Sequence, residues 1–185
     1  MNNLVKTTAS RYGLIIAGIG ISYTLLAYLI DLELLVNPYM GIGLWIVNFI
    51  LLIVAVSTVK KSFGGFISFK DAFSTFLLTY AASALITALF SILLFSLIDP
   101  TAAERLHELI IESTVNMMEK FGAPEEQIET QVESLENNQQ FSMVNQVRGF
   151  FMGIVIFAVI GLIVAAIMKK NKPEFIEHTE EDTQS

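Results

Sequence analysis

Residues 60–73 read KKSFGGFISFKDAF, and this stretch lies between two long apolar runs. Lys60 and Lys61 suit the C-terminal end of a helix, where cations interact favourably with the helix dipole. Gly64 and Gly65 follow at once, and adjacent glycines favour non-helical backbone. The stretch therefore predicts that one helix ends here and that the chain turns back.

The second half of the stretch predicts the start of the next helix. Ser68-x-x-Asp71 fits the pattern that caps a helix N-terminus, so we expect this helix to begin near Phe69. From Phe69 to Ile98 it would be about 45 Å long at ~1.5 Å per residue. Because the hydrocarbon core of a bilayer is only ~30 Å thick, we expect this helix to tilt or to project from it.

Four windows of the chain are long and apolar and contain no Asp, Glu, Lys, Arg or His: residues 12–30, 40–59, 73–98 and 149–168. Each is close to the ~20 residues that cross a bilayer as a helix. The whole chain is 54% hydrophobic and only 16% charged, whereas soluble domains carry about 25% charged residues. We therefore predict four membrane-spanning helices, and we interpret the first window as a retained span, because it is longer than the apolar core of a signal peptide.

The composition also excludes several kinds of chemistry. The chain has no cysteine, so it forms no disulfide, thiolate zinc site or cysteine nucleophile. Its net charge of −7 argues against a nucleic-acid partner. No nucleophile with a matching base can be assembled, and Gly64-Gly65 lacks the lysine and the spacing of a phosphate-binding loop. We expect no enzyme activity, no catalytic residues, no cofactor and no resident metal.

The basic residues predict the orientation in the membrane. Eight of the 11 precede the first window, lie between the second and third, or follow the fourth. By the positive-inside rule that side is cytoplasmic, and both termini are then in the cytoplasm. The segment 99–148 falls on the opposite side.

Residues 99–148 predict a helical hairpin outside the membrane. Asp99-Pro100 suits a helix start, and Gly122 and Pro124 suit the turn between two arms. We expect the second arm to run on into the fourth span. Apolar stripes mark both arms: Leu106, Leu109, Ile110, Met117 and Phe121 in the first, and Ile128, Val132 and Leu135 in the second.

The hairpin is acidic, with carboxylates repeated every four residues on each arm: Glu104, Glu108 and Glu112, then Glu125, Glu129 and Glu133. One interpretation is a solvated acidic face. The other is a weak divalent-cation site, since carboxylates suit hard ions, or a contact for a basic partner. Glu104-x-x-His107 resembles half of a di-iron motif, but no second half exists, so we expect His107 to be a surface histidine.

Small and hydroxyl side chains stand four residues apart within the windows: Thr75, Thr79, Ser83, Thr87 and Ser91 in the third, and the pairs Gly149-x-x-x-Gly153 and Gly161-x-x-x-Ala165 in the fourth. Such spacing is typical of close helix packing, within one molecule or between copies. The alternative is a polar passage, although the windows show no ionisable residue and no broken helix at depth. Asn48 is the only strongly polar side chain at mid-membrane; it predicts either a helix–helix hydrogen bond or a ligand for a substrate.

Several motifs together resemble a known family. The turn G-G-x-I-S-F-K-D-A-F, the I-D-P at 98–100 and the acidic insert before the last span are similar to those of the bacterial membrane proteins grouped as domain of unknown function 4199. The resemblance covers roughly residues 8–170. It implies a small multi-span protein of the bacterial inner membrane, and it offers no activity, cofactor or catalytic residue.

We therefore predict an all-α protein with a three-span part (1–98), the acidic hairpin (99–148), a fourth span (149–168) and a disordered acidic cytoplasmic tail (169–185). The leading hypothesis for function is a non-catalytic protein in the lipid bilayer whose hairpin contacts a protein partner or ions, or which forms a homodimer. The alternative is a small transporter or channel subunit with a Ser/Thr-lined passage.

Overall fold

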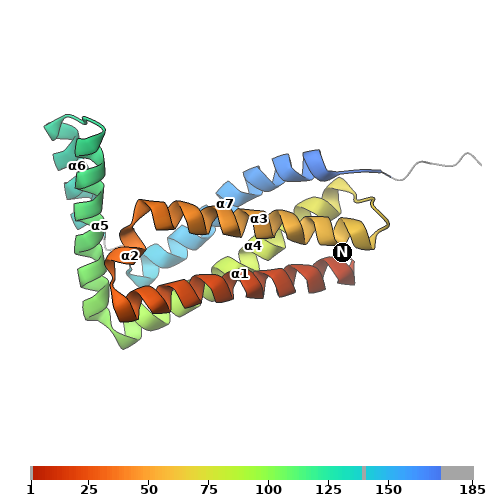
Figure 1. Cartoon of the computed structure of the whole chain (residues 1–185), viewed down its shortest axis with the longest axis horizontal. Helices are drawn as coiled ribbons and strands as arrows, with labels where there is room; N and C mark the ends of the chain where they lie inside the picture. The colour runs from red at the N-terminus through yellow and green to blue at the C-terminus, as the bar shows by residue number, and fades with distance from the viewer. Residues whose placement is uncertain (1, 139–140, 172–185) are drawn as a thin grey trace, which may run out of the picture.

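The computed structural model describes residues 2–138 and 141–171, and the predicted tail beyond residue 171 lies outside this range. The described residues form seven α-helices and one π-helical segment, as predicted for an all-α protein. Four helices are long enough and apolar enough to span a membrane and run along a common bundle (Figure 1). They are α1 (Asn3–Ile30), α3 (Pro38–Ser62), α4 (Phe69–Ser91) continued by the π-helix η1 (Ile92–Ile98), and α7 (Met143–Met168).

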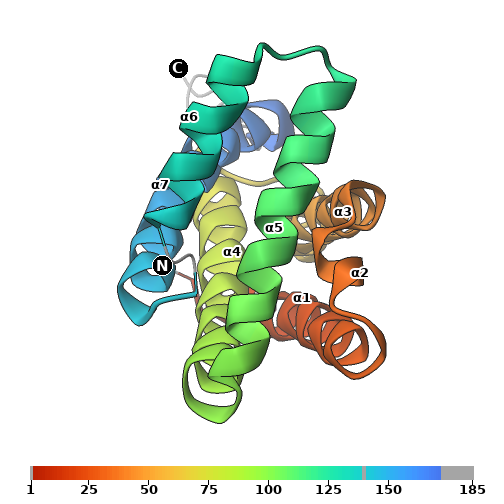
Figure 2. The same ribbon diagram turned by 90° about the vertical axis from the view of Figure 1, so that its left-hand side faces the viewer.

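The central helix of the bundle is α4, which packs against α1, α3 and α7. Figure 2 shows α4 with α7 on one side and α1 and α3 on the other. The largest fully buried side chain, Phe76, belongs to α4 and lies in the main core with Leu52, Val56 and Val164. The fold is therefore organised around the third span.

The outer faces of the bundle are apolar and exposed. No span buries more than 22% of its most apolar window, and large side chains such as Leu29, Ile30 and Ile167 are more than two-thirds exposed. Such a surface is unfavourable in water, whereas helices satisfy all their backbone hydrogen bonds in lipid. The exposed faces are thus the lipid-contacting surface.

The two ends of the bundle differ. One end carries the short α2 (Glu33–Val36), which the sequence did not predict, and the hairpin of α5 (Pro100–Lys120) and α6 (Glu125–Glu136). We call it the hairpin end, and we call the other the loop end, after the turn at residues 63–68. The hairpin lies across its end, crosswise to the spans (Figures 1 and 2). A second small core holds it there, built around Leu94, Phe95 and Leu106.

The helix ends follow the predicted signals. Gly64 and Gly65 have positive φ angles, and the Gly65 N–H donates to the Lys60 carbonyl at 2.9 Å. This is the bonding pattern with which glycine terminates a helix. Ser68 accepts a hydrogen bond from the Asp71 N–H at 3.0 Å, so α4 begins at Phe69 as expected.

The hairpin likewise begins where predicted. Asp99 caps α5 through the Ala102 N–H at 3.0 Å, with Pro100 in the first turn. Gly122, with φ of 72°, ends the same helix. A capping carboxylate followed by proline thus marked the helix start, and a glycine marked its end.

The prediction that the second arm runs on into the fourth span is wrong. Helix α6 ends at Glu136, and α7 begins anew at Met143 with Ser142 as its N-cap. Asn137 is the C-terminal cap of α6, and asparagine is a poor helix former that favours such positions. The break lets the chain turn from a direction across the bundle end to one along the bundle.

The third span reaches Ile98 as a helix, as predicted, but its last part near the hairpin end is π-helical and not α-helical. Residues Ile92–Ile98 are π-helical, and the Asp99 N–H donates to the Leu94 carbonyl, five residues earlier, at 2.8 Å. The neighbouring Leu94 and Phe95 are both buried in the small core beneath α5. The wider turn accompanies this packing at the junction of span and hairpin.

Candidate functional site: a polar cavity between the spans

A cavity of about 430 Å³ lies between α1, α3, α4 and α7. It belongs to the half of the bundle nearer the hairpin, since Gln146 and Phe150 line it from the first turns of α7 and Ser91 from the end of α4. No Asp, Glu, Lys, Arg or His of the described residues lines it. Its polar lining comes from all four spans: Thr24, Asn48, Tyr80, Ser83, Thr87, Ser91 and Gln146.

Among the residues that line the cavity, Asn48 has a polar atom without a hydrogen-bond partner in the described residues. Its Oδ1 atom is buried and has no hydrogen-bond partner within the described part of the chain. Leaving a buried amide oxygen unpaired in an apolar environment costs several kcal/mol, roughly 2–7 depending on the reference state. The cavity beside Asn48 leaves space next to this unpaired atom.

Packed aromatic rings lie on the loop-end side of the cavity, which Tyr80 lines. Tyr80 stacks on Phe157 with ring centroids 3.8 Å apart, and Phe157 lies 6.4 Å from Phe76. Phe49, next to Asn48 on α3, meets Phe76 edge-on at 6.3 Å. These four rings form a packed layer on the loop-end side of the cavity, which we call the aromatic floor.

The predicted row of hydroxyl side chains on the third span divides into two parts. Thr75 and Thr79 are fully buried, and their hydroxyls donate to the carbonyls of Asp71 at 2.7 Å and of Thr75 at 2.6 Å. Ser83 is nearly buried but reaches the cavity, which Thr87 and Ser91 also line. A step of four residues turns about 40° further around an α-helix, so the row winds from the packed side to the cavity side.

The predicted glycines also differ in their surroundings. A Cβ atom added at Gly161 would lie 2.9 Å from Phe76 Cδ1, and one at Gly153 would collide with the Tyr80 hydroxyl. Nothing lies within 4 Å of such an atom at Gly149. A close contact between helices also involves Gly13 of α1, where a Cβ would lie 2.8 Å from Ala82 Cβ. Gly13-x-x-x-Ala17 is the sequence signal for this contact, and the sequence-based predictions did not include it.

The acidic residues of the hairpin are all exposed: Glu104, Glu108, Glu112, Glu125, Glu129 and Glu133. Among the described residues a single ion pair forms, between Arg105 and Glu108 at 3.2 Å. No group of three potential metal ligands occurs in residues 2–138 and 141–171. The carboxylates are thus presented to solvent separately and not gathered into a coordination site.

His107 is not the surface histidine that the sequence predicted. It lines a second cavity of about 550 Å³ with Glu104, Glu108 and Ser142, between α5 and the start of α7. Its Nδ1 atom is buried, and the described residues offer it no hydrogen bond. The prediction failed because the break between α6 and α7 brings Phe141 and Ser142 over the face that carries His107.

Asp99 joins the spans to the hairpin. Its carboxylate accepts the Ala102 N–H and also the Tyr28 hydroxyl, the latter at 2.9 Å. These hydrogen bonds stabilise the ionised form, and with the Ala102 N–H as the largest cause the pKa of Asp99 lies below its ordinary value. Ionised Asp99 thus caps α5 and ties it to α1.

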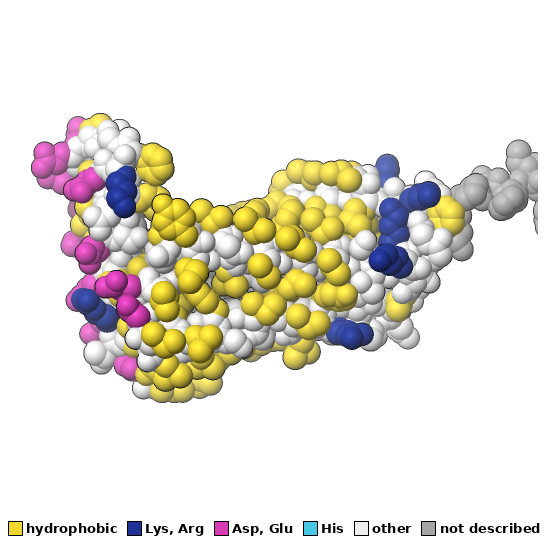
Figure 3. Space-filling model, viewed as in Figure 1, with side chains coloured by type: hydrophobic (Ala, Val, Ile, Leu, Met, Phe, Trp, Pro, Cys, Tyr) yellow, Lys and Arg dark blue, Asp and Glu magenta, His cyan; other side chains and the backbone are white. Residues whose placement is uncertain are grey.

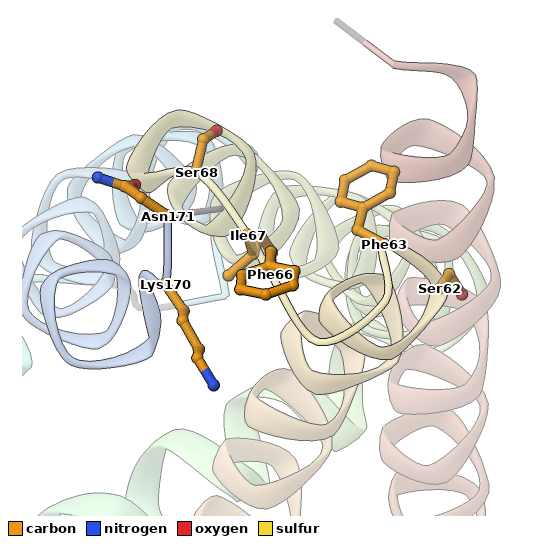
Figure 4. A pocket seen from close by; sticks show the side chains of 7 residues that line it. All are labelled: Ser62, Phe63, Phe66, Ile67, Ser68, Lys170 and Asn171. Atoms are coloured by element: carbon orange, nitrogen blue, oxygen red, sulfur yellow. The ribbon is translucent and has the colours of Figure 1, made fainter. Parts of the chain in front are cut away.

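At the loop end, the turn is fastened to the last residues of α7. Ile67 and Lys170 exchange two backbone hydrogen bonds of 2.9 Å, and the Lys60 ammonium donates to the Met168 carbonyl at 2.8 Å. Figure 4 shows the shallow pocket beside them, with Lys170 and Asn171 on one side and Phe63 on the other. Lys61, Lys70 and Lys169 are exposed around this end.

Four apolar helices and a lipid-contacting surface define a multi-pass helical membrane protein. The family model described as "Protein of unknown function (DUF4199)" matches residues 11–170, so the chain belongs to this family. No curated protein and no solved structure shows a significant match to the chain.

Proposed function

We propose that the protein is a non-catalytic protein of the bacterial cytoplasmic membrane that binds a small, uncharged polar solute in the cavity between its spans. The unpaired Oδ1 of Asn48 carries this proposal. A polar atom in the membrane interior needs a partner, and the cavity beside it has the volume of a small-molecule pocket, which ranges over about 300–1,000 Å³.

The chemistry of the lining indicates the class of solute. Hydroxyl and amide groups offer both donors and acceptors, whereas the described lining contains no charged group to balance an ion. The aromatic floor favours a binding pocket over the Ser/Thr-lined channel of the alternative hypothesis. Transport through the bundle would require Tyr80 and Phe157 to separate.

Thermal unfolding of the lipid-reconstituted protein tests this function. The probes are glycerol, glucose, inositol and acetamide, with glutamate and lysine as charged comparators. A ligand at ten times its dissociation constant stabilises the folded state by about 1.4 kcal/mol. We expect at least one uncharged probe to raise the melting temperature of wild type and of Ile46→Leu, a lipid-facing control on the same helix, but not of Asn48→Leu.

Polyols also stabilise proteins without binding, and such an effect would be equal in all three proteins. Equal shifts in Asn48→Leu and wild type, or no shift with any uncharged probe, would therefore contradict the proposal. In that case the cavity is a hydrated gap in the packing.

A second candidate function is recognition of a basic partner by the hairpin. The observation that favours it is the fixed position of the hairpin, since Ala102, Leu106 and Leu109 are buried against the bundle end while the carboxylates remain exposed. Deleting the hairpin would uncover that end, so charge-neutral substitutions are the better test.

The variant for this test combines Glu104→Gln, Glu108→Gln and Glu112→Gln, which keeps the helix and removes three charges. We expect a stoichiometric partner to co-purify with wild type in mild detergent and to be lost from this variant, as identified by mass spectrometry. A preparation without a partner from both proteins would exclude recognition through the first arm, and size measurements on the same samples would report a homodimer.

The distribution of charge supports the predicted orientation. Lysines gather at the loop end and carboxylates at the hairpin end (Figure 3), and positive residues favour the cytoplasmic side. Because the chain has no cysteine, single substitutions such as Ser62→Cys and Asn116→Cys can be labelled cleanly. A membrane-impermeant maleimide added to intact cells should label position 116 and not position 62; the reverse pattern would invert the topology.

A further inference from the structure

The apolar stripe of α5 continues beyond the part that packs against the bundle. Leu106 and Leu109 are buried at the bundle end, and one turn later the Ser113 hydroxyl donates a hydrogen bond of 3.2 Å to the Val36 carbonyl of α2. Beyond Ser113, α5 makes no hydrogen bond to the described residues of the spans. The helix nevertheless continues to Lys120.

Met117 and Phe121 extend the same stripe into this projecting part. At about 100° per residue they lie some 20° and 60° around the helix from Leu106. They are 44% and 86% exposed, respectively. These two large apolar side chains lie on the same face of α5 as Leu106 and Leu109. Beyond Ser113, however, this face packs against little protein.

The direction of this face follows from the arrangement of the helices. Since α5 lies across the end of the bundle (Figure 1), the side that rests on the bundle faces along the spans. Phe121 lies about 12 Å beyond Ser113 along the helix. Between Ser113 and Phe121, the side of α5 that carries Leu106 therefore faces the region beside the bundle. In that region the apolar surfaces of the spans contact lipid.

Three carboxylates of α5 lie on the other side of the helix. Glu104, Glu108 and Glu119 are roughly 140–160° away from Leu106 by the same helical geometry, and all three are exposed. Figure 3 shows carboxylates on the outer side of the hairpin, and hydrophobic side chains on the side toward the spans that continue onto the apolar surface of the bundle. Lys120, at the edge of the apolar face, is placed to reach lipid phosphates.

We propose that the projecting part of α5 lies on the bilayer surface at the hairpin end, with Met117 and Phe121 inserted among the lipids of that leaflet. A helix with one apolar face and one charged face binds the membrane interface in this way. The continuity of this face with the lipid-contacting surface of the spans identifies lipid, and not a second protein, as what covers it. Membrane contact then fixes which face of the hairpin is presented to the aqueous side.

Tryptophan fluorescence in vesicles tests this proposal. The single native tryptophan, Trp45, is first replaced by Phe, which preserves a ring for its stacking partner Phe49. Into this background we introduce Phe121→Trp or, as a matched control on the opposite side of the same helix turn, Glu119→Trp. Both proteins are reconstituted in phosphatidylcholine vesicles with and without brominated acyl chains, which quench only indoles within the lipid.

We expect bromination to lower the emission of Phe121→Trp by about twofold or more and to leave Glu119→Trp nearly unchanged, as for an interfacial apolar face. Equal, water-like emission from both positions would overturn the proposal. A blue-shifted indole at position 121 that bromine does not quench would also overturn it, because protein would then cover the site. If Phe121→Trp fails to fold, Met117→Trp in the same background is judged by the same outcomes.

Discussion

The half of the bundle near the loop end and the half near the hairpin end are formed by the same four helices, yet they pack differently. Near the loop end Val56, Val59 and Phe76 are completely buried, and helices approach one another closely. Near the hairpin end the same helices surround a cavity of about 430 Å³ with an unpaired amide oxygen. The boundary is the aromatic layer around Tyr80 and Phe157.

This difference indicates which half holds the helices together and which half contains the proposed solute site. Lipid is as apolar as a leucine side chain, so membrane helices are held together by close packing and not by exclusion from water. The closely packed half therefore supplies the stability that holds the four helices together. The hollow half contributes less packing, and it holds the proposed solute site.

The largest effect is expected from overpacking the closely packed half. Gly13→Leu places a side chain against Ala82 Cβ and the Thr79 carbonyl oxygen, which would lie 2.8 and 3.1 Å from a Cβ atom at this position. Because a backbone atom cannot move aside, we expect a loss of about 3 kcal/mol, the upper part of the usual range. Denaturant unfolding in detergent measures it. Gly18→Leu, which meets nothing within 4 Å, should be neutral, and equal losses would refute the close contact.

Removing a ring from the same half should cost somewhat less. Phe76 is fully buried and contacts Phe49 and Phe157. In a soluble core Phe→Ala costs ~3–5 kcal/mol, but the part due to transfer out of water is small in lipid. We expect Phe76→Ala to lower the free energy of unfolding by about 2 kcal/mol. The lipid-facing control Phe151→Ala should change it little; a similar loss at both positions would argue against a dense core.

In the hollow half, Asn48→Leu should leave stability almost unchanged or raise it. The substitution removes the unpaired buried oxygen, whose burial without a partner is costly. We expect the free energy of unfolding, measured without added solute, to remain within about 1 kcal/mol of wild type or to increase. A loss as large as that of Phe76→Ala would mean that Asn48 serves packing, and the contrast between the halves would fail.

The smallest effect is a pH dependence at the junction with the hairpin. The pKa of Asp99 is lowered in the folded protein, so its contribution to stability is complete above the unfolded pKa, about 3.9. That contribution is lost as the pH falls through the lower folded pKa. Thermal unfolding between pH 7 and pH 3 should show this loss in wild type but not in Asp99→Asn, which keeps a capping side chain. If the melting temperatures of wild type and Asp99→Asn fell equally with pH, Asp99 would be excluded as the source of the pH dependence.

The sequence predicted the helices and most of their ends because those signals are local. Charge-free windows locate the spans, and the caps at Ser68 and Asp99 and the glycines at 64 and 122 depend only on neighbouring backbone. The π-helical segment, the short α2 and the break before α7 depend on how the hairpin packs across the bundle end. No local pattern reports that packing.

The cavity was only partly accessible to sequence reasoning. Asn48 and Thr87 were recognised as polar residues at depth, but Tyr80 and Gln146 were not associated with them. Four-residue spacing suggested one continuous stripe, whereas the turn of about 40° at each step carries Ser91 to nearly the opposite side of the helix from Thr75. Which residues share a cavity depends on helix rotation, and hydropathy does not report it.

The most direct test of the contrast between the two halves is the reactivity of single cysteines toward hydroxyethyl methanethiosulfonate, a small neutral reagent that attacks the thiolate. Thiolates form only where water reaches the sulfur. We predict that Asn48→Cys and Thr87→Cys react readily in reconstituted protein, whereas Ala55→Cys and Thr79→Cys, at fully buried positions, do not. If position 48 were as unreactive as position 55, the hollow half would be closed and dry, which would contradict the account.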